Sequence, residues 1–472
     1  MPGRTIAVIG AGFSGTLLAL HILRRCPLST GVLLIERNRQ FGRGRAYATP
    51  NPNHLLNVPA AKMSAFSDRS LDFLSWLRAE AETEGGEAPT GKCFASRHRF
   101  GSYVRHLLND ELQHGRDRLQ LIRGDVQALY TSGNSILVEL DNKQPVQADI
   151  AVLAIGNFPP EPPPVAVPSF YETPLYRPDP WAEDALGNVE SDAPVLLIGS
   201  GLTMVDVVIS LLDGGHRGPI TVLSRRGLLP LRHVTATGGA EEAALAFPTS
   251  VVPLLRLLRR ESELAVSRGG TWQQVVDQLR PFMQDVWQAM PMPERRRFLR
   301  HLRPWWDIHR HRISAPVAER IDAARVRSQL NIRAGRIRAY DVRGDQVEVT
   351  YRQRGTDRLA RVTAARVVNC SGPGCDFDRI ADPLVRQLLR DGMVRPDALK
   401  LGLDVSGNCA LLSRDGAITP NLFAVGPATK GAFWEMTAVP DIRRQCEHVA
   451  GHIAGLIRAS AAHGHAATLV RG

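Results

Sequence analysis

The chain has 472 residues, of which 44% are hydrophobic and 22% charged, and its formal net charge at pH 7 is +11. This length and composition are typical of a soluble globular protein with two or three domains. The positive charge comes from arginines that are spread along the chain rather than gathered in one block with interleaved aromatic residues. This distribution argues against nucleic acid as a partner and favours small anionic ligands.

The N-terminus superficially resembles a signal peptide, because Arg4 precedes an apolar stretch. A glycine-rich turn inside that stretch and a charged residue soon after it argue against export, and no run is long enough to span a bilayer. Six cysteines are scattered with no Cys-x-x-Cys pair: Cys26, Cys93, Cys370, Cys375, Cys409 and Cys446. We therefore expect a cytoplasmic protein with reduced thiols, no membrane segment and no metal site. The missing redox pair also weighs against a disulfide reductase.

The strongest pattern lies in the first forty residues. Residues 6–15 join an apolar, β-branched run to a Gly-x-Gly-x-x-Gly turn; a helical segment and a second apolar run follow, and Glu36 stands 21 residues after the last glycine. Gly10 permits a tight turn, Gly12 lets the backbone approach a pyrophosphate, and Gly15 lets the helix pack close to the strand. Glu36 is placed to accept hydrogen bonds from a ribose. The order of elements predicts a dinucleotide site.

A second unit of the same kind begins near residue 194. Residues 195–201 form a strand and a Gly-x-Gly turn, and Met204 stands where the third glycine would be. Arg225 follows Met204 by the same 21 residues, so Arg225 and Arg226 take the place that a carboxylate holds in the first unit. A carboxylate binds a free 2′-hydroxyl, whereas guanidinium groups pair with a 2′-phosphate. The second site is therefore expected to take NADPH; a solvated basic turn is the alternative.

The remaining segments suggest how these units are joined. A proline-rich stretch, 159–168, is the candidate linker, and residues 236–330 have helical patterns. Strand patterns return from about residue 347 and are expected to complete the first sheet. We predict three parts: 1–165 as the first part of one domain, 190–345 as an inserted domain with the helical segment 236–330, and 346–472 as the rest of the first domain.

The stretch 303–312 is unusual because two tryptophans stand beside two histidines and several arginines. Such a group could form a pocket for a planar or carboxylate-bearing anion. A basic helix end that extends its side chains into water is the alternative.

Several motifs together resemble one family over essentially the whole chain. They are Gly10-x-Gly-Phe-Ser-Gly15, Gly42-x-Gly-x-Ala-Tyr47, Leu56-Asn-Val-Pro-Ala60 with Met63, Arg97-x-x-x-Gly-x-Tyr103, Ala154-x-Gly-Asn157, Gly199-x-Gly-Leu-Thr-x-Val-Asp206, Trp306-Asp-x-His-Arg-His-Arg312 and Phe433-Trp-Glu-x-Thr-Ala-Val-Pro-Asp-Ile442. These motifs resemble the FAD/NAD(P)-binding family of FAD-dependent urate hydroxylases, which also includes N-hydroxylases that act on aspartate.

This resemblance implies an α/β fold with two Rossmann-like dinucleotide-binding domains, the first for FAD and the inserted one for NADPH. It also implies a monooxygenase that uses O₂ and hydroxylates a small anionic substrate through a flavin C4a-hydroperoxide. Urate is the first substrate to test, and N-hydroxylation of an amino acid such as aspartate is the alternative. A flavin-dependent NAD(P)H oxidoreductase, or a redox-responsive binding protein that makes no oxygenated product, is the third hypothesis. A homodimer is left open.

The motifs and the resemblance select three sets of site residues. For FAD they are Gly10, Gly12, Phe13, Ser14, Gly15, Glu36, Arg37, Gly156, Gly426 and Thr437. For NADPH they are Gly199, Ser200, Gly201, Thr203, Arg225 and Arg226. For catalysis they are Asn57, expected in a loop over the isoalloxazine, and His309 with Arg310 on the substrate side.

Two features depart from related flavoproteins. The Phe-x-Gly-x-x-x-His fingerprint of the class B monooxygenases is absent, and the late strand ends in Gly426-Pro427 where many FAD enzymes have Gly-Asp. The contact that this aspartate usually makes to the ribityl chain must come from another side chain. A helix beginning near Pro440 offers its N-terminus to negative charge on a flavin ring.

Overall fold

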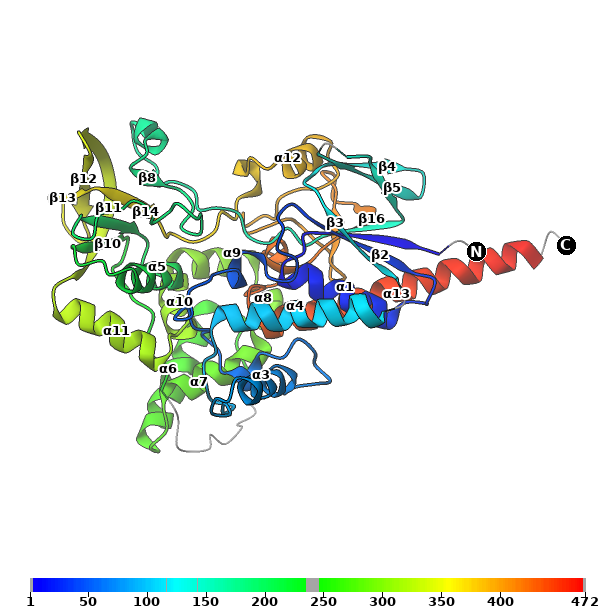
Figure 1. The fold of residues 1–472 in the computed structure, drawn as a ribbon, viewed down its shortest axis with the longest axis horizontal. Helices are drawn as coiled ribbons and strands as arrows, with labels where there is room; N and C mark the ends of the chain where they lie inside the picture. The colour runs from blue at the N-terminus through cyan, green and yellow to red at the C-terminus, as the bar shows by residue number, and fades with distance from the viewer. Residues whose placement is uncertain (1–2, 116, 142, 235–245, 470–472) are drawn as a thin grey trace. The chain divides into compact units, whose positions relative to one another are not determined.

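The computed structural model describes residues 3–115, 117–141, 143–234 and 246–469, with side chains as far as residue 460. Figure 1 shows a mixed α/β protein with two largely parallel sheets, as the sequence predicts. The chain divides into two compact units: unit 1 comprises Met1–Pro50, Val58–Asn157 and Cys375–Gly472, and unit 2 comprises Asn51–Asn57 and Phe158–Gly374. The part of the expected helical segment at residues 236–245 lies outside the described residues.

Unit 1 is built on a six-stranded sheet. In spatial order its strands are β15 (Ala410–Leu412), β16 (Ile418–Ala424), β7 (Ile150–Leu153), β1 (Thr5–Ile9), β2 (Gly31–Glu36) and β3 (Leu119–Arg123). All neighbours are parallel except β15 and β16. The central strands β1 and β7 are almost completely buried, because helices cover both faces of a parallel sheet. A second, antiparallel sheet contains β4 (Val126–Ser132), β5 (Ser135–Leu140) and β6 (Val146–Ala148).

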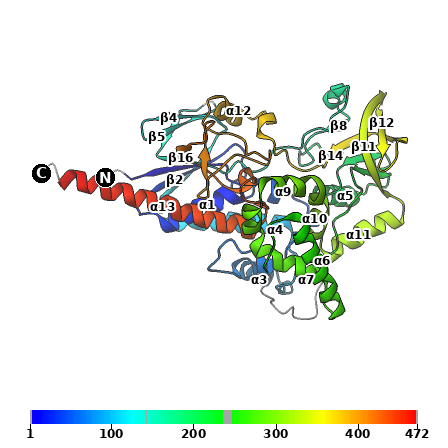
Figure 2. The same cartoon turned by 180° about the vertical axis from the view of Figure 1, so that it is seen from behind.

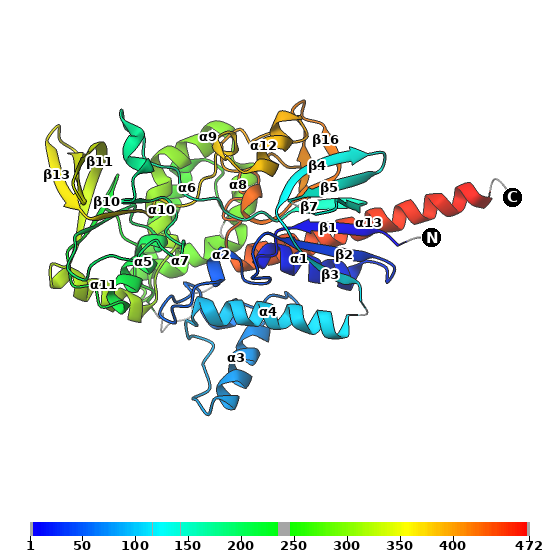
Figure 3. The same ribbon diagram turned by 45° about the horizontal axis from the view of Figure 1, so that its top comes forward.

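Unit 1 also contains helices that pack around its sheet. They are α1 (Phe13–Arg25), α2 (Gly44–Tyr47), α3 (Asp72–Thr83), α4 (Arg97–His114), α12 (Pro383–Arg390) and α13 (Val439–Leu469), with short turns η1 (Ala60–Lys62), η5 (Phe377–Arg379) and η6 (Gly426–Thr429). Helix α1 is buried nearly all round, since α13 and α4 both pack against it (Figures 2 and 3). In the described part of the chain, no helix has the length and apolar character needed to cross a membrane.

Unit 2 contains the second sheet and most of the helical insertion. Its strands in spatial order are β13 (Leu359–Ala364), β12 (Gln346–Gln353), β11 (Leu330–Arg343), β10 (Ile220–Ser224), β9 (Val195–Ile198), β14 (Arg366–Asn369) and β8 (Tyr176–Arg177). Its helices are α5 (Leu202–Asp213), α6 (Val251–Ser267), α7 (Trp272–Leu279), α8 (Met283–Ala289), α9 (Met292–Arg297), α10 (Arg303–Arg310) and α11 (Ala315–Val326), with short turns η2 (Pro168–Glu172), η3 (Arg280–Phe282) and η4 (Phe298–Leu302).

The expected return to the first domain at residue 346 is wrong. Strands β12 and β13 extend the sheet of unit 2, and β14 pairs with β9, with Val367 beside Leu196. The chain returns to unit 1 only at Cys375, and the proline-rich stretch after Asn157 already lies in unit 2. The reason is that the same pattern, a buried strand followed by a glycine of positive φ, occurs once in each sheet. Gly156 follows β7 in unit 1, and Gly372 follows β14 in unit 2. The two strands look alike in sequence, so both were expected in one sheet.

A short segment from the first irregular excursion also belongs to unit 2, which the sequence did not indicate. The side-chain amides of Asn51 and Asn53 donate to the Asp213 carboxylate at 2.9 and 3.1 Å. The buried imidazole of His54 has its Nε2 2.9 Å from Ser210 Oγ on the same helix, α5. Leu55 packs against the apolar core beneath that helix. These contacts attach residues 51–57 to unit 2.

One buried histidine predicts a specific pH dependence of folding. His21, on α1, is 4% exposed, its ring lies edge-on to Phe66, and within the described part of the chain its Nε2 has no hydrogen-bond partner. Burial lowers the pKa of His21 from 6.5 to about 4. The unfolded chain therefore binds the proton first, so the associated stability is complete above pH 6.5 and is lost as the pH falls toward 4.

Replacing His21→Leu should remove this component. Between pH 7 and pH 4 we expect the wild-type free energy of unfolding to fall by about 3 kcal/mol more than that of the variant. Urea unfolding of both proteins at these pH values measures the difference, and carboxylate titrations common to both proteins cancel. Equal pH dependence in the two proteins would contradict a buried neutral imidazole.

Candidate functional site

In unit 1, the turn between β1 and α1 has no space for a side chain at two of its three glycines. Gly10 has φ +101°, and a Cβ there would lie 2.4 Å from the carbonyl oxygen of Ala154. At Gly15, a Cβ would lie 1.8 Å from the carbonyl oxygen of Gly10. Gly12 precedes α1 and no side chain caps the helix, so the first N–H groups of α1 keep their donors for a ligand. The turn fits a pyrophosphate.

The carboxylate of Glu36 is fixed beside this turn. One of its oxygens accepts a hydrogen bond from the backbone N–H of Ala11 at 2.8 Å, and the other accepts from the N–H of Asn38 at 3.0 Å. The oxygen bonded to the Asn38 N–H also accepts from the side-chain amide of Asn38 at 3.3 Å, whereas the oxygen bonded to Ala11 keeps a lone pair to which a ribose hydroxyl can donate. Turn and carboxylate together fit a dinucleotide with a free 2′-hydroxyl.

In unit 2, the turn between β9 and α5 repeats this geometry. Gly199 has φ +100°, and a Cβ there would lie 2.5 Å from the carbonyl oxygen of Cys370. Gly201 precedes α5, no side chain caps that helix, and a Cβ at Gly201 would meet nothing within 4 Å. Thr203 lies half-buried in the first turn of α5. This second helix N-terminus is equally suited to a pyrophosphate.

Ser200 was predicted to contact the cofactor, and its hydroxyl also has partners inside the protein. Its Oγ donates to the carbonyl of Leu228 at 2.6 Å and lies 2.9 Å from Ser224 Oγ. Ser224 Oγ in turn accepts from the backbone N–H of Gly227 at 2.9 Å. These bonds hold the turn that carries the two arginines following β10, so the structure supports a positioning role for Ser200.

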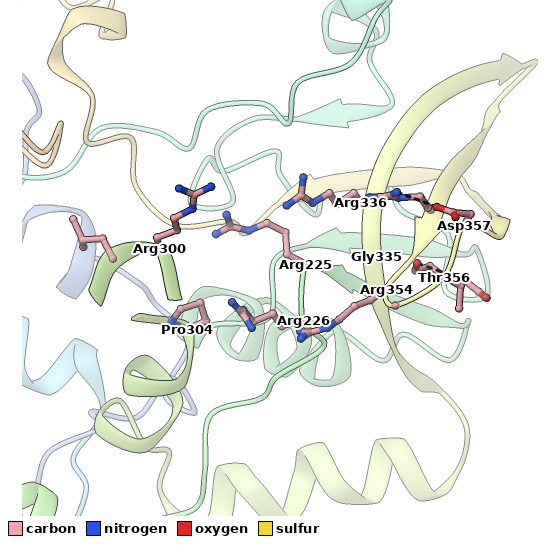
Figure 4. Close-up of a pocket in the computed structure, with 13 residues that line it drawn as sticks. Arg225, Arg226, Arg300, Pro304, Gly335, Arg336, Arg354, Thr356 and Asp357 are labelled. Carbon is pink, nitrogen blue, oxygen red and sulfur yellow. Dashed lines mark hydrogen bonds and ion pairs between the residues drawn. The ribbon is translucent and has the colours of Figure 1, made fainter. Parts of the chain in front are cut away.

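Arg225 and Arg226 lie at an open pocket of about 560 Å³ that contains four further arginines (Figure 4). The pocket is lined by Arg225, Arg226, Leu299, Arg300, Pro304, Gly335, Arg336, Arg352, Gln353, Arg354, Gly355, Thr356 and Asp357. Burial lowers the pKa of Arg225, and so do the neighbouring charges of Arg303, Arg336 and Arg226. Positive charge is thus concentrated where an anion would neutralise it.

No sequence motif marked Arg300, Arg336, Arg352 or Arg354 as a site residue. Arg352 lies near the end of β12 and Arg354 directly follows that strand; their alternate spacing is typical of side chains on one face of a strand, and this signal was available in the sequence. Their proximity to Arg225 depends on which strands pair, and that pairing could not be deduced from the sequence.

Two of the residues predicted for FAD are engaged elsewhere through their side chains. The ring of Phe13 packs against Tyr47 and Phe100, with centroids 6.1 and 5.6 Å away, so only its backbone faces the turn. Arg37 forms ion pairs with Asp125 at 3.1 Å and Asp382 at 2.7 Å. For both residues, a ligand contact through the side chain stays a prediction.

Gly426 lies against α1 and is held by a residue that the sequence did not reveal. Its φ is +74°, and a Cβ there would lie 2.6 Å from the Oγ of buried Ser14. The side-chain carbonyl of Gln445 accepts from the Gly426 N–H at 2.7 Å, and its amide donates to Thr429 Oγ1 at 2.8 Å. Gln445 therefore braces the strand end that lacks the usual aspartate.

The last two residues predicted for FAD are open to a ligand. Gly156 has φ +68°, and a Cβ added there would meet no heavy atom within 4 Å. Thr437 is exposed two residues before α13, whose N-terminus remains the predicted partner of negative charge on a flavin.

The three residues predicted for catalysis all lie in unit 2. The backbone carbonyl of Asn57 accepts a hydrogen bond from His233 Nε2 at 2.9 Å. His309 Nδ1 donates to the carbonyl of Trp305 at 2.8 Å, one helical turn earlier, and Arg310 is only 5% exposed. None of these contacts assigns a chemical role, so their catalytic function stays a prediction.

The end of the stretch 303–312 packs against helix α7, which carries Trp272. Arg312 is 3% exposed, pairs with Asp277 at 2.5 Å and lies over the ring of Trp272. The charge of Arg312 is therefore already compensated. From this stretch, Pro304 lines the arginine pocket.

Comparisons with known proteins agree with a fold that binds dinucleotides. Residues 7–158 match the sequence model of a family described as FAD-NAD(P)-binding. No curated protein matches the chain. The fold is that of a flavoprotein with two dinucleotide-binding domains.

Solved structures resemble the chain over nearly its whole length. The ornithine N-hydroxylase of Kutzneria sp. 744, with reduced FAD, NADP⁺ and L-ornithine, superposes with a TM-score of 0.66 at 15% identity, covering 97% of this chain and 100% of that one. The cadaverine monooxygenase of Erwinia amylovora, bound to FAD, has a TM-score of 0.66 at 13% identity, covering 96% and 95%. Lactococcus lactis thioredoxin reductase has a TM-score of 0.53 at 12% identity, covering 96% and 99%. At these identities the likeness establishes the fold.

The first turn predicts the effect of a single methyl group. Gly15→Ala would place a Cβ against the backbone oxygen of Gly10, so we expect loss of bound FAD and a lower melting temperature. The matched control is Gly451→Ala on α13, where an added Cβ meets nothing within 4 Å and should stabilise the helix by up to about 1 kcal/mol. Flavin absorbance per protein and thermal unfolding measure both effects. Normal flavin content in Gly15→Ala would contradict the predicted site.

Proposed function

We propose that this protein is an NADPH-dependent FAD monooxygenase that hydroxylates the primary amine of a small amino-acid-like substrate. The observation that carries the proposal is the opposite charge at two equivalent sites. One phosphate-binding turn is followed by Glu36 and the other by Arg225 and Arg226. A carboxylate suits the free ribose of FAD, and guanidinium groups suit the 2′-phosphate of NADPH. The amine substrate is supported by the full-length likeness to ornithine and cadaverine hydroxylases.

The chain's own residues would bind and orient the two cofactors. Uncapped N–H groups at the starts of α1 and α5 bind the pyrophosphates, and Glu36 accepts from the adenosine ribose of FAD. Bound in unit 1, FAD supplies the hydride acceptor and the oxygen-activating chemistry. In the overall reaction one amine, one O₂, one NADPH and one proton give the hydroxylamine, water and NADP⁺.

The cysteines disfavour the disulfide-reductase chemistry of flavoproteins with a related fold. All six are free thiols and the sequence has no Cys-x-x-Cys pair. Cys370, Cys409 and Cys446 are buried, and burial raises the pKa of each thiol, that of Cys409 to about 12. A thiol with a raised pKa forms little of the thiolate that disulfide exchange needs.

A coupled assay tests the reaction and the substrate together. The FAD-loaded protein is given NADPH and O₂ with aspartate, ornithine, lysine or urate, while NADPH, hydroxylamine, peroxide and urate absorbance are followed. We expect one amine to accelerate NADPH oxidation and to yield hydroxylamine in equal amount. Urate loss that matches NADPH use would instead support the urate hydroxylase predicted from the motifs. Slow oxidation that no substrate stimulates, with peroxide as product, would favour a flavin reductase without oxygenation.

The cofactor assignment of unit 2 makes a separate prediction. Replacing Arg225→Ala and Arg226→Ala together should raise the KM for NADPH about tenfold or more and leave the KM for NADH nearly unchanged. The control is Arg232→Ala, an exposed arginine paired with Glu319 in the same unit. Steady-state kinetics with both nucleotides measure the ratio. An equal rise for both nucleotides would show that the arginines do not recognise the 2′-phosphate.

A further inference from the structure

Hairpin β11–β12 adds to unit 2 a second set of cations far in sequence from those that follow β10. We propose that Arg336 and Arg354 on this hairpin bind the phosphate on the adenosine ribose, and that they determine selectivity for NADPH together with Arg225 and Arg226. The inference deepens the proposed function and rests on its assignment of NADPH to unit 2.

Strand pairing places the hairpin at the ligand-binding end of the sheet. Strand β10 ends at Ser224, which pairs with Ala334 of β11. Strand β11 continues to Arg343, so its second half extends past the carboxyl end of β10, where open α/β sheets bind ligands. The turn after β10 packs closely on β11, because a Cβ at Gly227 would lie 3.2 Å from the Cβ of Ala334. Arg336 comes two residues after that contact.

The register between β11 and β12 puts three arginines on one face. Arg336 pairs with Arg352, and the backbone N–H of Arg354 donates to the carbonyl of Ala334 at 2.9 Å. Paired residues share a face and side chains alternate along a strand, so Arg336, Arg352 and Arg354 share one face. Like charges directly opposite each other destabilise a sheet. The arrangement therefore has a cost that a bound anion would remove.

Only part of this charge is compensated inside the protein. Arg352 pairs with Asp357 at 3.2 Å. Across the ranges that the structure describes, Arg336 and Arg354 form no ion pair with a carboxylate, and neither does Arg300 on η4. Figure 4 shows these side chains gathered around one space with Arg225 and Arg226. Solvated surface arginines would point apart, whereas these converge from four elements, which favours a dianionic phosphate as ligand.

The direct test is nucleotide binding to the FAD-loaded protein, measured by isothermal titration calorimetry. The probes are adenosine 2′,5′-bisphosphate and adenosine 5′-monophosphate, which differ only in the 2′-phosphate. For Arg336→Ala/Arg354→Ala we expect about tenfold weaker binding of the bisphosphate and unchanged binding of the monophosphate. The matched control is Arg338→Ala/Arg358→Ala, which removes the same charge from two exposed positions outside the pocket lining, one on β11 and one in the connection between β12 and β13.

The outcomes separate this inference from the proposed function. If the wild-type protein does not prefer the bisphosphate, the NADPH assignment and this inference both fail. If it does and the double variant keeps that preference, only the role of the hairpin fails. An equal loss in the control variant would show a diffuse charge effect and would also overturn the inference. Partial recovery in Arg336→Lys/Arg354→Lys, whose fold is checked by thermal unfolding, would support direct phosphate binding.

Discussion

The whole arrangement depends on backbone contact at two places where no side chain fits. At each place, a glycine of positive φ contacts the backbone at the end of the neighbouring strand. Gly10 lies against Ala154, directly after β7, and Gly199 lies against Cys370, directly after β14. This contact closes the turn. The helix that follows begins after a second glycine, Gly12 in unit 1 and Gly201 in unit 2, and no side chain caps its first N–H groups. The predicted phosphate sites therefore depend on steric exclusion at these glycines. Glu36, Arg225 and Arg226 could contact a bound nucleotide only because this backbone geometry places its phosphates beside them.

The sequence could predict these features because they are local. Glycine spacing, apolar strands and the residue 21 positions later all lie within forty residues of one another, and each carries a known geometric requirement. The two-domain α/β fold follows from that repeat. Glu36 bonds to its turn through Ala11, and Ser200 of the second turn bonds to Ser224 and Leu228, which flank the Arg225–Arg226 pair, as the spacing indicated.

What failed was non-local. Strand β14 has the apolar character of any buried strand, and nothing in its residues states whether it pairs with β7 or β9. Arg336 and Arg354 look like ordinary surface residues until the register of β10, β11 and β12 is known. Gln445 lies on a helix nineteen residues after the glycine it holds, with no motif to mark it. In each case the missing information was a partner in space.

The seven residues 51–57 have a consequence for dividing the protein into parts. A fragment cut at the apparent linkers, covering 158–374, would contain α5 but not the amides of Asn51 and Asn53 that bind Asp213, nor the imidazole of His54. Asp213 would keep its contact with Arg320 yet lose two donors, and a buried apolar surface under Leu55 would meet water. The nucleotide-binding unit is thus not encoded by one continuous stretch of gene. An autonomous version would need those seven residues joined to it by a new connection.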